Sequence, residues 1–219
     1  MKYFKFFSLL ICGFPIVVTA QLDGVDYDWK QKKNKKGITV SISSVEGSSY
    51  NALRAEMVVD AKVAQLVALV EDMAACPDWA AMCKEARVEK RISDTESFVY
   101  TYNKIPFPVS DRDVYAHVVW TQDPKTMRVS MTSTATKGGT AKTNAVRVEK
   151  AVTQCHFTPN DDGTTIVENF AHFDPNGPIP AMIANLMMIN APYKTLIRMR
   201  EIVESGGYAD SEIPFLDKP

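Results

Sequence analysis

The amino-acid sequence predicts an α+β fold in which an antiparallel β-sheet curls around one long C-terminal helix, an arrangement called a helix-grip fold. Strand-like segments follow one another closely between residues 86 and 173, and short turns such as Asp123-Pro124 join them as in an antiparallel meander. An apolar, methionine-rich segment then runs from Pro180 to Glu204. At about 1.5 Å per residue, a helix of that length would extend roughly 37 Å, far enough to cross a small domain.

The first part of the chain supplies early strands and one short helix. Strand patterns occur around Trp29 and over residues 38–42 and 53–59. Asp60 is a favourable N-cap, and apolar residues then recur at helical spacing, so a helix is expected over residues 61–72.

The later strands and the final helix follow from alternation and from residues that break regular structure. Strands are expected over residues 86–92, 97–103, 113–122, 127–134, 145–157 and 164–173. Pro180 suits the first turn of the final helix, Pro192 should kink it, and Gly206-Gly207 should end it. One apolar helix packed on a long antiparallel sheet gives a two-layer α+β architecture.

Length and charge limit the classes of protein to consider. The chain has 219 residues, a formal net charge of -1 and no visible internal repeat or linker, which suits one globular domain with a real core. We do not expect nucleic-acid binding, because an extended interface needs lysine and arginine clustered over one face. We divide the chain into a leader over residues 1–20, one domain over 21–206 and a C-terminal tail over 207–219.

The leader has the features of a secretory signal peptide. Lys2 and Lys5 give a positive start, residues 6–18 are apolar, and Val18-Thr19-Ala20 is a small-residue cleavage site. The competing interpretation is a retained membrane anchor, but the apolar stretch is shorter than the roughly 20 residues that span a bilayer. We therefore expect a mature protein that begins near Gln21 and is secreted or periplasmic.

Export would place the cysteines of the mature chain, Cys76, Cys83 and Cys155, in an oxidising compartment. On an unbroken helix, the seven residues from Cys76 to Cys83 would rise about 10 Å, which is too far for a disulfide. Pro77 and a turn near Trp79 would let the chain double back. A Cys76–Cys83 bridge with a free Cys155, or three buried thiols, both remain open.

A proline-stiffened loop between residues 104 and 115 is the most informative segment. Pro106 and Pro108 hold Phe107 at the tip of a preset bend. The loop ends in Asp111-Arg112-Asp113, where the guanidinium can make paired charge-assisted hydrogen bonds to the carboxylates, or bonds to nearby carbonyls. Such a clamp would anchor the loop to the sheet.

A wider pattern surrounds this loop. Trp29, the segment 37–40 and Trp79 precede it, and Asp174-Pro175-Asn176-Gly177-Pro178-Ile179-Pro180 leads into the final helix, which contains Asn185. In this order and spacing, residues 26–205 resemble the StAR-related lipid-transfer (START) domain family, in particular its secreted bacterial branch. The resemblance implies a cavity between sheet and helix for one lipid, either a phospholipid or a sterol-like molecule. It also implies a mouth formed by residues 105–110 and the end of the helix.

The resemblance and the strand alternation together give candidate cavity residues. The apolar candidates on strands are Val114, Ala116, Val118, Trp120, Met127, Val129 and Met131, and those on the helix are Ile183, Leu186, Met187 and Ile197. Polar candidates are Tyr100, Tyr102, Arg112 and Asn169, with Phe107 at the mouth. Some animal members carry a buried arginine six residues beyond the motif arginine, where this chain has Val118. A charged clamp is therefore not expected at that position.

Two other function classes remain. A helix-grip cavity can host cyclase or hydrolase chemistry, and Asp111, Asp113 or His117 would then have to face the cavity as acid or base. The lysine-rich run over residues 30–36 is either a solvated turn or a membrane-docking patch of a peripheral adaptor. His156 and His172 are too far apart for one metal on the expected hairpin. We expect a monomer with no metal or cofactor that binds a lipid, touches a membrane transiently and catalyses no reaction.

Overall fold

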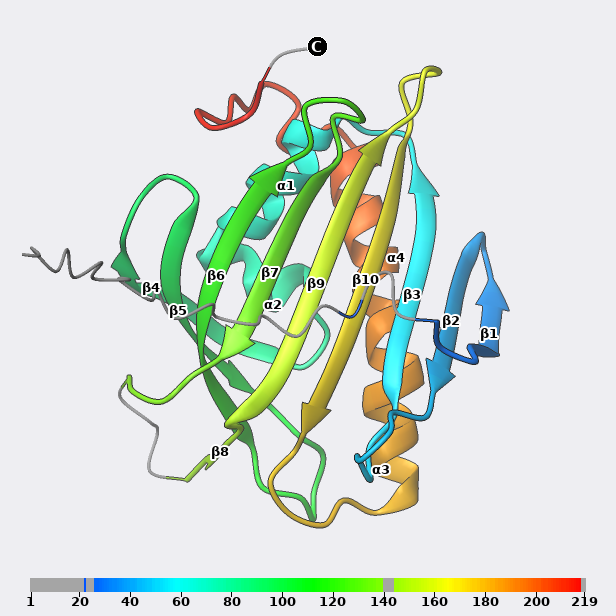
Figure 1. The fold of residues 1–219 in the computed structure, drawn as a ribbon, viewed down its shortest axis with the longest axis vertical. Coiled ribbons are helices and arrows are strands. Elements are labelled where there is room, and N and C mark those ends of the chain that lie inside the picture. The colour runs from blue at the N-terminus through cyan, green and yellow to red at the C-terminus, as the bar shows by residue number, and fades with distance from the viewer. Residues whose placement is uncertain (1–21, 23–25, 140–143, 218–219) are drawn as a thin grey trace, which may run out of the picture.

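The computed structural model describes residue 22 and residues 26–139 and 144–217, so the proposed signal peptide lies outside the described residues. These residues form one sheet of ten strands that curls around a C-terminal helix (Figure 1), and the predicted helix-grip fold is confirmed. The strand order is β1-β2-β3-β10-β9-β7-β6-β5-β4, and all neighbours in it are antiparallel. The strands are β1 (Lys30–Lys35), β2 (Ile38–Ser43), β3 (Ala52–Val59), β4 (Cys83–Arg91), β5 (Glu96–Asn103), β6 (Arg112–Gln122), β7 (Val129–Ala135), β8 (Val146–Arg147), β9 (Lys150–Pro159) and β10 (Thr165–Asp174).

The final helix is continuous from Ala181 to Glu204 but changes its winding in the middle. It consists of α3 (Ala181–Asn185), a π-helical segment (Leu186–Asn190) and α4 (Ala191–Glu204). Pro192 has no N–H to donate to the carbonyl four residues earlier, and the wider turn lies directly before it. A π-helical turn therefore lies just before Pro192, while the predicted kink at this proline stays a prediction.

Shorter helices follow β3 in the chain and pack between the sheet and the C-terminal helix. They are α1 (Val63–Glu71), a 3₁₀ turn (Met73–Ala75) and α2 (Cys76–Trp79). The expected N-cap Asp60 is wrong, because the helix begins at Val63 and its N-cap is Lys62, whose backbone N–H donates to the Gln65 side chain. A disulfide joins Cys76 to Cys83 with their Cα atoms 6.0 Å apart, while Cys155 is free. The chain does double back after Pro77, as this bridge requires.

Three segments differ from the expected strands. Residues 145–157 split into β8 and β9, and β8 pairs in parallel with the start of β6. Met127 lies in a turn with a positive φ of 55°, so β7 begins two residues later than predicted. The lysine run forms the exposed edge strand β1 rather than a turn. Lysine on an open sheet edge discourages pairing with other chains.

The hydrophobic core lies between the concave face of the sheet and helices α1 and α4. Its members include Leu66 and Leu69 of α1, Leu196 and Met199 of α4, and Phe157 of β9. The C-terminal tail also belongs to this packing, since Phe215 lies 5.9 Å from the Trp120 ring and Tyr208 donates to Asp72. The tail therefore covers one end of the core.

Candidate functional site

A cavity of about 420 Å³ lies between the concave face of the sheet and the C-terminal helix. Alternate residues of neighbouring strands line it, because side chains two apart on a strand share a face. The strand wall consists of Ala86 of β4, Val99, Thr101 and Asn103 of β5, Arg112, Val114, Ala116 and Val118 of β6, Met131, Ser133 and Ala135 of β7, Ala151, Thr153, Cys155 and Phe157 of β9, and Val167, Asn169, Ala171 and Phe173 of β10. Most of this wall is apolar.

The opposite wall comes from the helices and from the disulfide-bonded segment. The C-terminal helix contributes Met187, Ala191, Pro192, Thr195, Leu196 and Met199, and the segment between α2 and β4 contributes residues 79–83. Ala81 N–H donates to the Thr195 hydroxyl at 3.0 Å, which ties this segment to the helix. The Cys76–Cys83 bridge thus holds part of the cavity wall in place.

The structure places the predicted cavity residues in three groups. Arg112, Val114, Ala116, Val118, Met131, Asn169 and Met187 line the cavity. Trp120 and Val129 are buried in the core beyond its end, and Ile183, Leu186 and Ile197 lie on the helix outside the lining. Met127 is in the turn before β7, Phe107 is exposed at the loop tip, and Tyr100 and Tyr102 face the other side of the sheet.

Sequence reasoning named Asn169 of β10 but missed the other residues that β9 and β10 contribute to the wall. Their alternating residues from Ala151 to Phe157 and from Val167 to Phe173 carried a usable signal. Residues 79–83 carried no such signal in the sequence, because they line the cavity through a turn that the disulfide fixes.

One end of the cavity is closed by packed side chains. Val118 and Met131 line this end, and Trp120 beyond them stacks near Phe157 with ring centroids 6.4 Å apart. Glu71 also lines it, but its carboxylate accepts a hydrogen bond from the Trp120 indole at 2.6 Å and one from Arg91 at 2.9 Å. The acidic charge at this end therefore already has partners.

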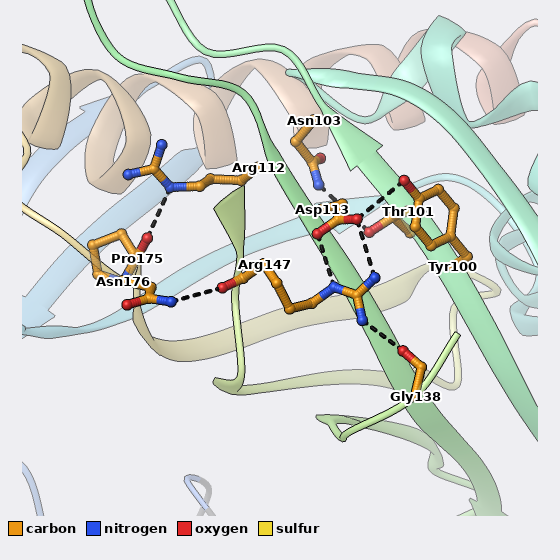
Figure 2. A network of polar contacts seen from close by, with 9 residues as sticks. All are labelled: Tyr100, Thr101, Asn103, Arg112, Asp113, Gly138, Arg147, Pro175 and Asn176. Carbon is orange, nitrogen blue, oxygen red and sulfur yellow. Dashed lines mark hydrogen bonds and ion pairs between the residues drawn. The ribbon is translucent and has the colours of Figure 1, made fainter. Parts of the chain in front are cut away.

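Arg112 occupies the other end, beneath the loops. Its side chain is only 5% exposed; Nε donates to the Pro175 carbonyl at 2.8 Å and Nη1 donates to the Ser110 carbonyl. Figure 2 shows the guanidinium reaching toward Pro175. Of the two bonding modes predicted for Arg112, the structure has the carbonyl bonds. The predicted pairing with Asp111 or Asp113 is wrong, because successive residues of a strand face opposite sides of the sheet.

The two carboxylates of the triplet have other partners on the opposite face. Asp113 is fully buried and accepts bonds from Arg147 Nε at 2.8 Å and Nη2 at 3.1 Å, with the Tyr100 hydroxyl at 3.2 Å (Figure 2). Arg147 comes from β8, so this ion pair ties β8 to β6.

Asp111 anchors the start of the loop. It accepts from the Tyr102 hydroxyl, from Lys104 Nζ at 3.0 Å and from Ile105 N–H at 3.0 Å. Burial alone would raise the pKa of Asp111, but these three hydrogen bonds outweigh it and the pKa is lowered. Asp111 is therefore an ionised structural carboxylate at neutral pH.

The catalytic candidates do not meet in the cavity. Asp111 and Asp113 are bonded as above, and His117 stacks on Phe98 and lies 2.7 Å from Glu96, so none of the three lines the cavity. His156 contacts Ser130 and His172 contacts Ser48. Within residues 26–139 and 144–217, no cluster of three histidine, cysteine or acidic side chains is suited to hold a metal.

Cys155 is the free thiol of the cavity wall. Asn169 Nδ2 lies 3.0 Å from its sulfur. Burial raises the pKa of Cys155 to about 11, although the Asn169 hydrogen bond acts in the opposite direction. The thiol is thus protonated at neutral pH and is a weak nucleophile.

Two large apolar side chains are exposed near the Arg112 end. Phe107 is 94% exposed and Met182 is 76% exposed. The β5–β6 loop and the start of α3, which carry them, lie at the same end of the molecule (Figure 1). Among the helices of the described chain, none has the length and apolar character needed to cross a bilayer.

The lysine run contacts the helix rather than the cavity. Lys33 Nζ lies 4.0 Å from the centre of the Tyr193 ring and donates to Asn190 at 2.9 Å. This lysine thus has a structural role in addition to its charge.

Comparison with known proteins places this geometry in a family. Residues 18–205 match the family model described as START domain. Uncharacterized protein PA1579 of Pseudomonas aeruginosa is 30% identical over 177 residues, which cover 81% of this chain and 87% of that protein. A StAR-related lipid transfer protein fragment from Xanthomonas axonopodis is 27% identical with a TM-score of 0.73, covering 80% of this chain and 98% of that one.

More distant structures share the fold. Human StAR-related lipid transfer protein 5 is 18% identical with a TM-score of 0.72, covering 81% of this chain and 86% of that chain. The Zhui aromatase/cyclase from a Streptomyces species is 10% identical with a TM-score of 0.50, covering 72% and 99%. The fold is thus found in proteins named for lipid transfer and in a cyclase. The matched family model covers most of the chain, and the protein belongs to the START domain family.

Proposed function

We propose that this protein holds one membrane-derived lipid in the cavity under the C-terminal helix and carries it between membranes without chemical change. The observation that carries the proposal is the cavity of about 420 Å³, whose wall is built from mainly apolar residues of six strands and of the C-terminal helix. The START domain match and the lipid-transfer name of the Xanthomonas structure support it.

The cavity lining favours an apolar ligand of irregular shape. Met131, Met187 and Met199 are flexible and can adapt to an irregular chain. Each methylene moved from water into such a site contributes about 0.8 kcal/mol, so a long acyl chain binds strongly from burial alone. Exchange of the lipid with a membrane then depends on opening the cavity.

The loop end is the proposed entrance. Ile105 and Pro175 line the cavity there, and both belong to loops rather than to the sheet. The exposed Phe107 and Met182 sit on the same end of the fold and are suited to enter a lipid surface. A transient membrane contact at this end would place the entrance beside the lipid to be taken up.

Catalysis is the less favoured function. A general acid or base must reach the bound molecule, and the three candidates Asp111, Asp113 and His117 lie outside the cavity lining. The similarity to the Streptomyces cyclase is a similarity of fold. A membrane adaptor with a filled interior is likewise less favoured, since the interior is hollow.

The proposal is tested by filling the cavity. Ala116→Trp combined with Met187→Trp adds two large rings to opposite walls. We expect the mature double variant to lose lipid uptake and to show no transfer of fluorescent lipid between vesicles above the spontaneous rate. Overpacking of this kind costs about 1 to 3 kcal/mol, so folding is checked by circular dichroism and thermal unfolding.

A matched control places the same two rings outside the cavity. Val58 and Ile92 are exposed, at 52% and 45%, and Val58→Trp with Ile92→Trp should transfer lipid as the wild type does. A folded cavity variant that transfers lipid at the wild-type rate would refute this cavity as the binding site. A chemically altered lipid, detected by mass spectrometry, would favour the enzyme instead.

A further inference from the structure

We infer that the bound lipid carries an anionic head group, either a carboxylate or a phosphate monoester, and that Arg112 binds this head group. The inference rests on the proposed function and narrows it from lipids in general to one class. It is carried by the position of Arg112 and by the partners of the surrounding charges.

Arg112 is a buried cation that lacks a carboxylate partner among the described residues. Its guanidinium has five N–H donors, and the structure uses them for two backbone carbonyls, those of Pro175 and Ser110. Nη2 has no hydrogen-bond partner among the residues that the structure describes. Donors therefore remain for a molecule in the cavity that Arg112 lines.

The nearby acids do not compensate this charge. Asp113 is bonded to Arg147 and Asp111 to Lys104, both on the opposite face of the sheet. Burial lowers the pKa of Arg112, and the phenol of Tyr50 is the described group that acts against this effect. An arginine stays protonated in proteins, so the cavity carries a positive charge removed from water.

An anionic ligand would supply the missing partner. A buried charge is costly unless it is paired and hydrogen-bonded, and a guanidinium matches a carboxylate or a phosphate with two parallel bonds. A cationic or neutral head group would leave Arg112 uncompensated. The arginine thus favours an anion over a neutral lipid of the same chain length.

The two ends of the cavity fix the orientation of such a ligand. At the far end Glu71 carries a negative charge already bonded to Trp120 and Arg91, beside the apolar Val118 and Met131. An anionic head group there would meet a like charge. The head group therefore lies at Arg112, under the loops, and the chain extends toward Val118.

The test compares ligands that share one chain and differ in the head group. Dodecanoate, dodecyl phosphate, dodecanol and dodecyltrimethylammonium are titrated into the lipid-free mature protein at pH 8, below their critical micelle concentrations, by calorimetry. We expect at least one of the two anions to bind about tenfold or more tightly than dodecanol, as a charged hydrogen bond implies, and the cation to bind most weakly. Which anion is preferred distinguishes a carboxylate from a phosphate head group.

The variant Arg112→Gln should abolish the preference for the anion over dodecanol while dodecanol binding stays within about threefold of the wild type. Arg147→Gln is the matched control, because this arginine lies at the same end of the sheet but binds Asp113 on the opposite face. It should keep the wild-type preference. Arg112→Lys, which retains the charge but not the planar fork, should keep part of it.

Each result bears on one of the two proposals. Equal binding of dodecanol and both anions by the wild type, or a preference that survives in Arg112→Gln, would overturn the inference while leaving lipid binding intact. If Arg112→Gln fails to fold, the wild-type head-group series and Arg112→Lys still decide the matter. Failure of all four ligands to bind, together with failure to extract any lipid from vesicles, would reject the proposed function itself.

Discussion

Arg112 and Arg147 lie at the same corner of the sheet and face opposite sides of it. Arg147, on β8, makes two bonds to the fully buried carboxylate of Asp113. Arg112, on β6, faces the cavity and donates to backbone carbonyls, and it forms no ion pair with an acid in the described part of the chain. Figure 2 shows the two guanidinium groups on their separate partners.

The difference between these two arginines separates a structural charge from a charge available to a ligand. On the outer side, an acid within the protein satisfies the cation, and the bond holds β8 against β6. On the inner side, Arg112 ties together the two loops that carry Ser110 and Pro175, and its side chain lines the cavity. Strand β6 thus carries the proposed head-group site, Arg112, and the partner of the structural ion pair, Asp113, on successive residues that face opposite sides of the sheet.

The largest expected effect on stability comes from removing the Asp113–Arg147 ion pair on the outer side of the sheet. Asp113→Asn removes the charge that compensates Arg147, and loss of one partner of a buried ion pair costs about 3 to 5 kcal/mol. Arg112→Gln should cost less, about 1 to 3 kcal/mol, since it removes hydrogen bonds to carbonyls and no ion pair. Urea unfolding of the lipid-free proteins measures both. Equal free energies of unfolding for Asp113→Asn and the wild type would show that the pair does not stabilise the fold.

Asp111 gives the next effect, and its sign depends on pH. Its pKa in the folded protein lies below the ordinary value of 3.8, so its ionised form stabilises the fold above that value, and the stabilisation is lost as the pH falls through the lowered pKa. At pH 7, Asp111→Asn should be less stable than the wild type by about 1 to 3 kcal/mol. The difference between the two proteins should shrink near pH 2. A difference that stays constant from pH 7 to pH 2 would mean that the Asp111 charge is not responsible.

The strand and helix pattern was largely predictable because it depends on local periodicity. The alternation in β6 and the length of the helix from Ala181 to Glu204 are both visible in the sequence and are confirmed. The split between β8 and β9 was not, since the two-residue strand β8 is held by its long-range pairing with Arg112 and Asp113. No local pattern carries that contact.

The cavity residues were only partly predictable. The alternation of β6 correctly placed Val114, Ala116 and Val118 on one wall, and the same rule would have kept Arg112 apart from Asp111 and Asp113. Which residues on this face of β6 line the cavity depends on where the cavity ends. The packing of Trp120 against Phe157 sets that end. On the helix, the π-helical turn shifts the residues after Asn190 relative to those before it, so a regular helical period does not give the lining face.

The smallest expected effect on stability comes from Phe107, at the tip of the loop that Arg112 holds. Phe107 is 94% exposed, so Phe107→Ser should change the free energy of unfolding by no more than about 0.5 kcal/mol. It should nevertheless weaken vesicle binding and slow transfer, because burying a phenylalanine side chain contributes about 1.5 to 3 kcal/mol. Vesicle cosedimentation and the lipid-transfer rate measure the two effects.

Ile92→Ser is the control, since Ile92 is also exposed but lies in the β4–β5 turn, at the opposite end of β5. Equal vesicle binding and transfer by Phe107→Ser and the wild type would move the membrane contact away from this loop, whereas a loss confined to Phe107→Ser would place it beside the end of the cavity that Arg112 occupies.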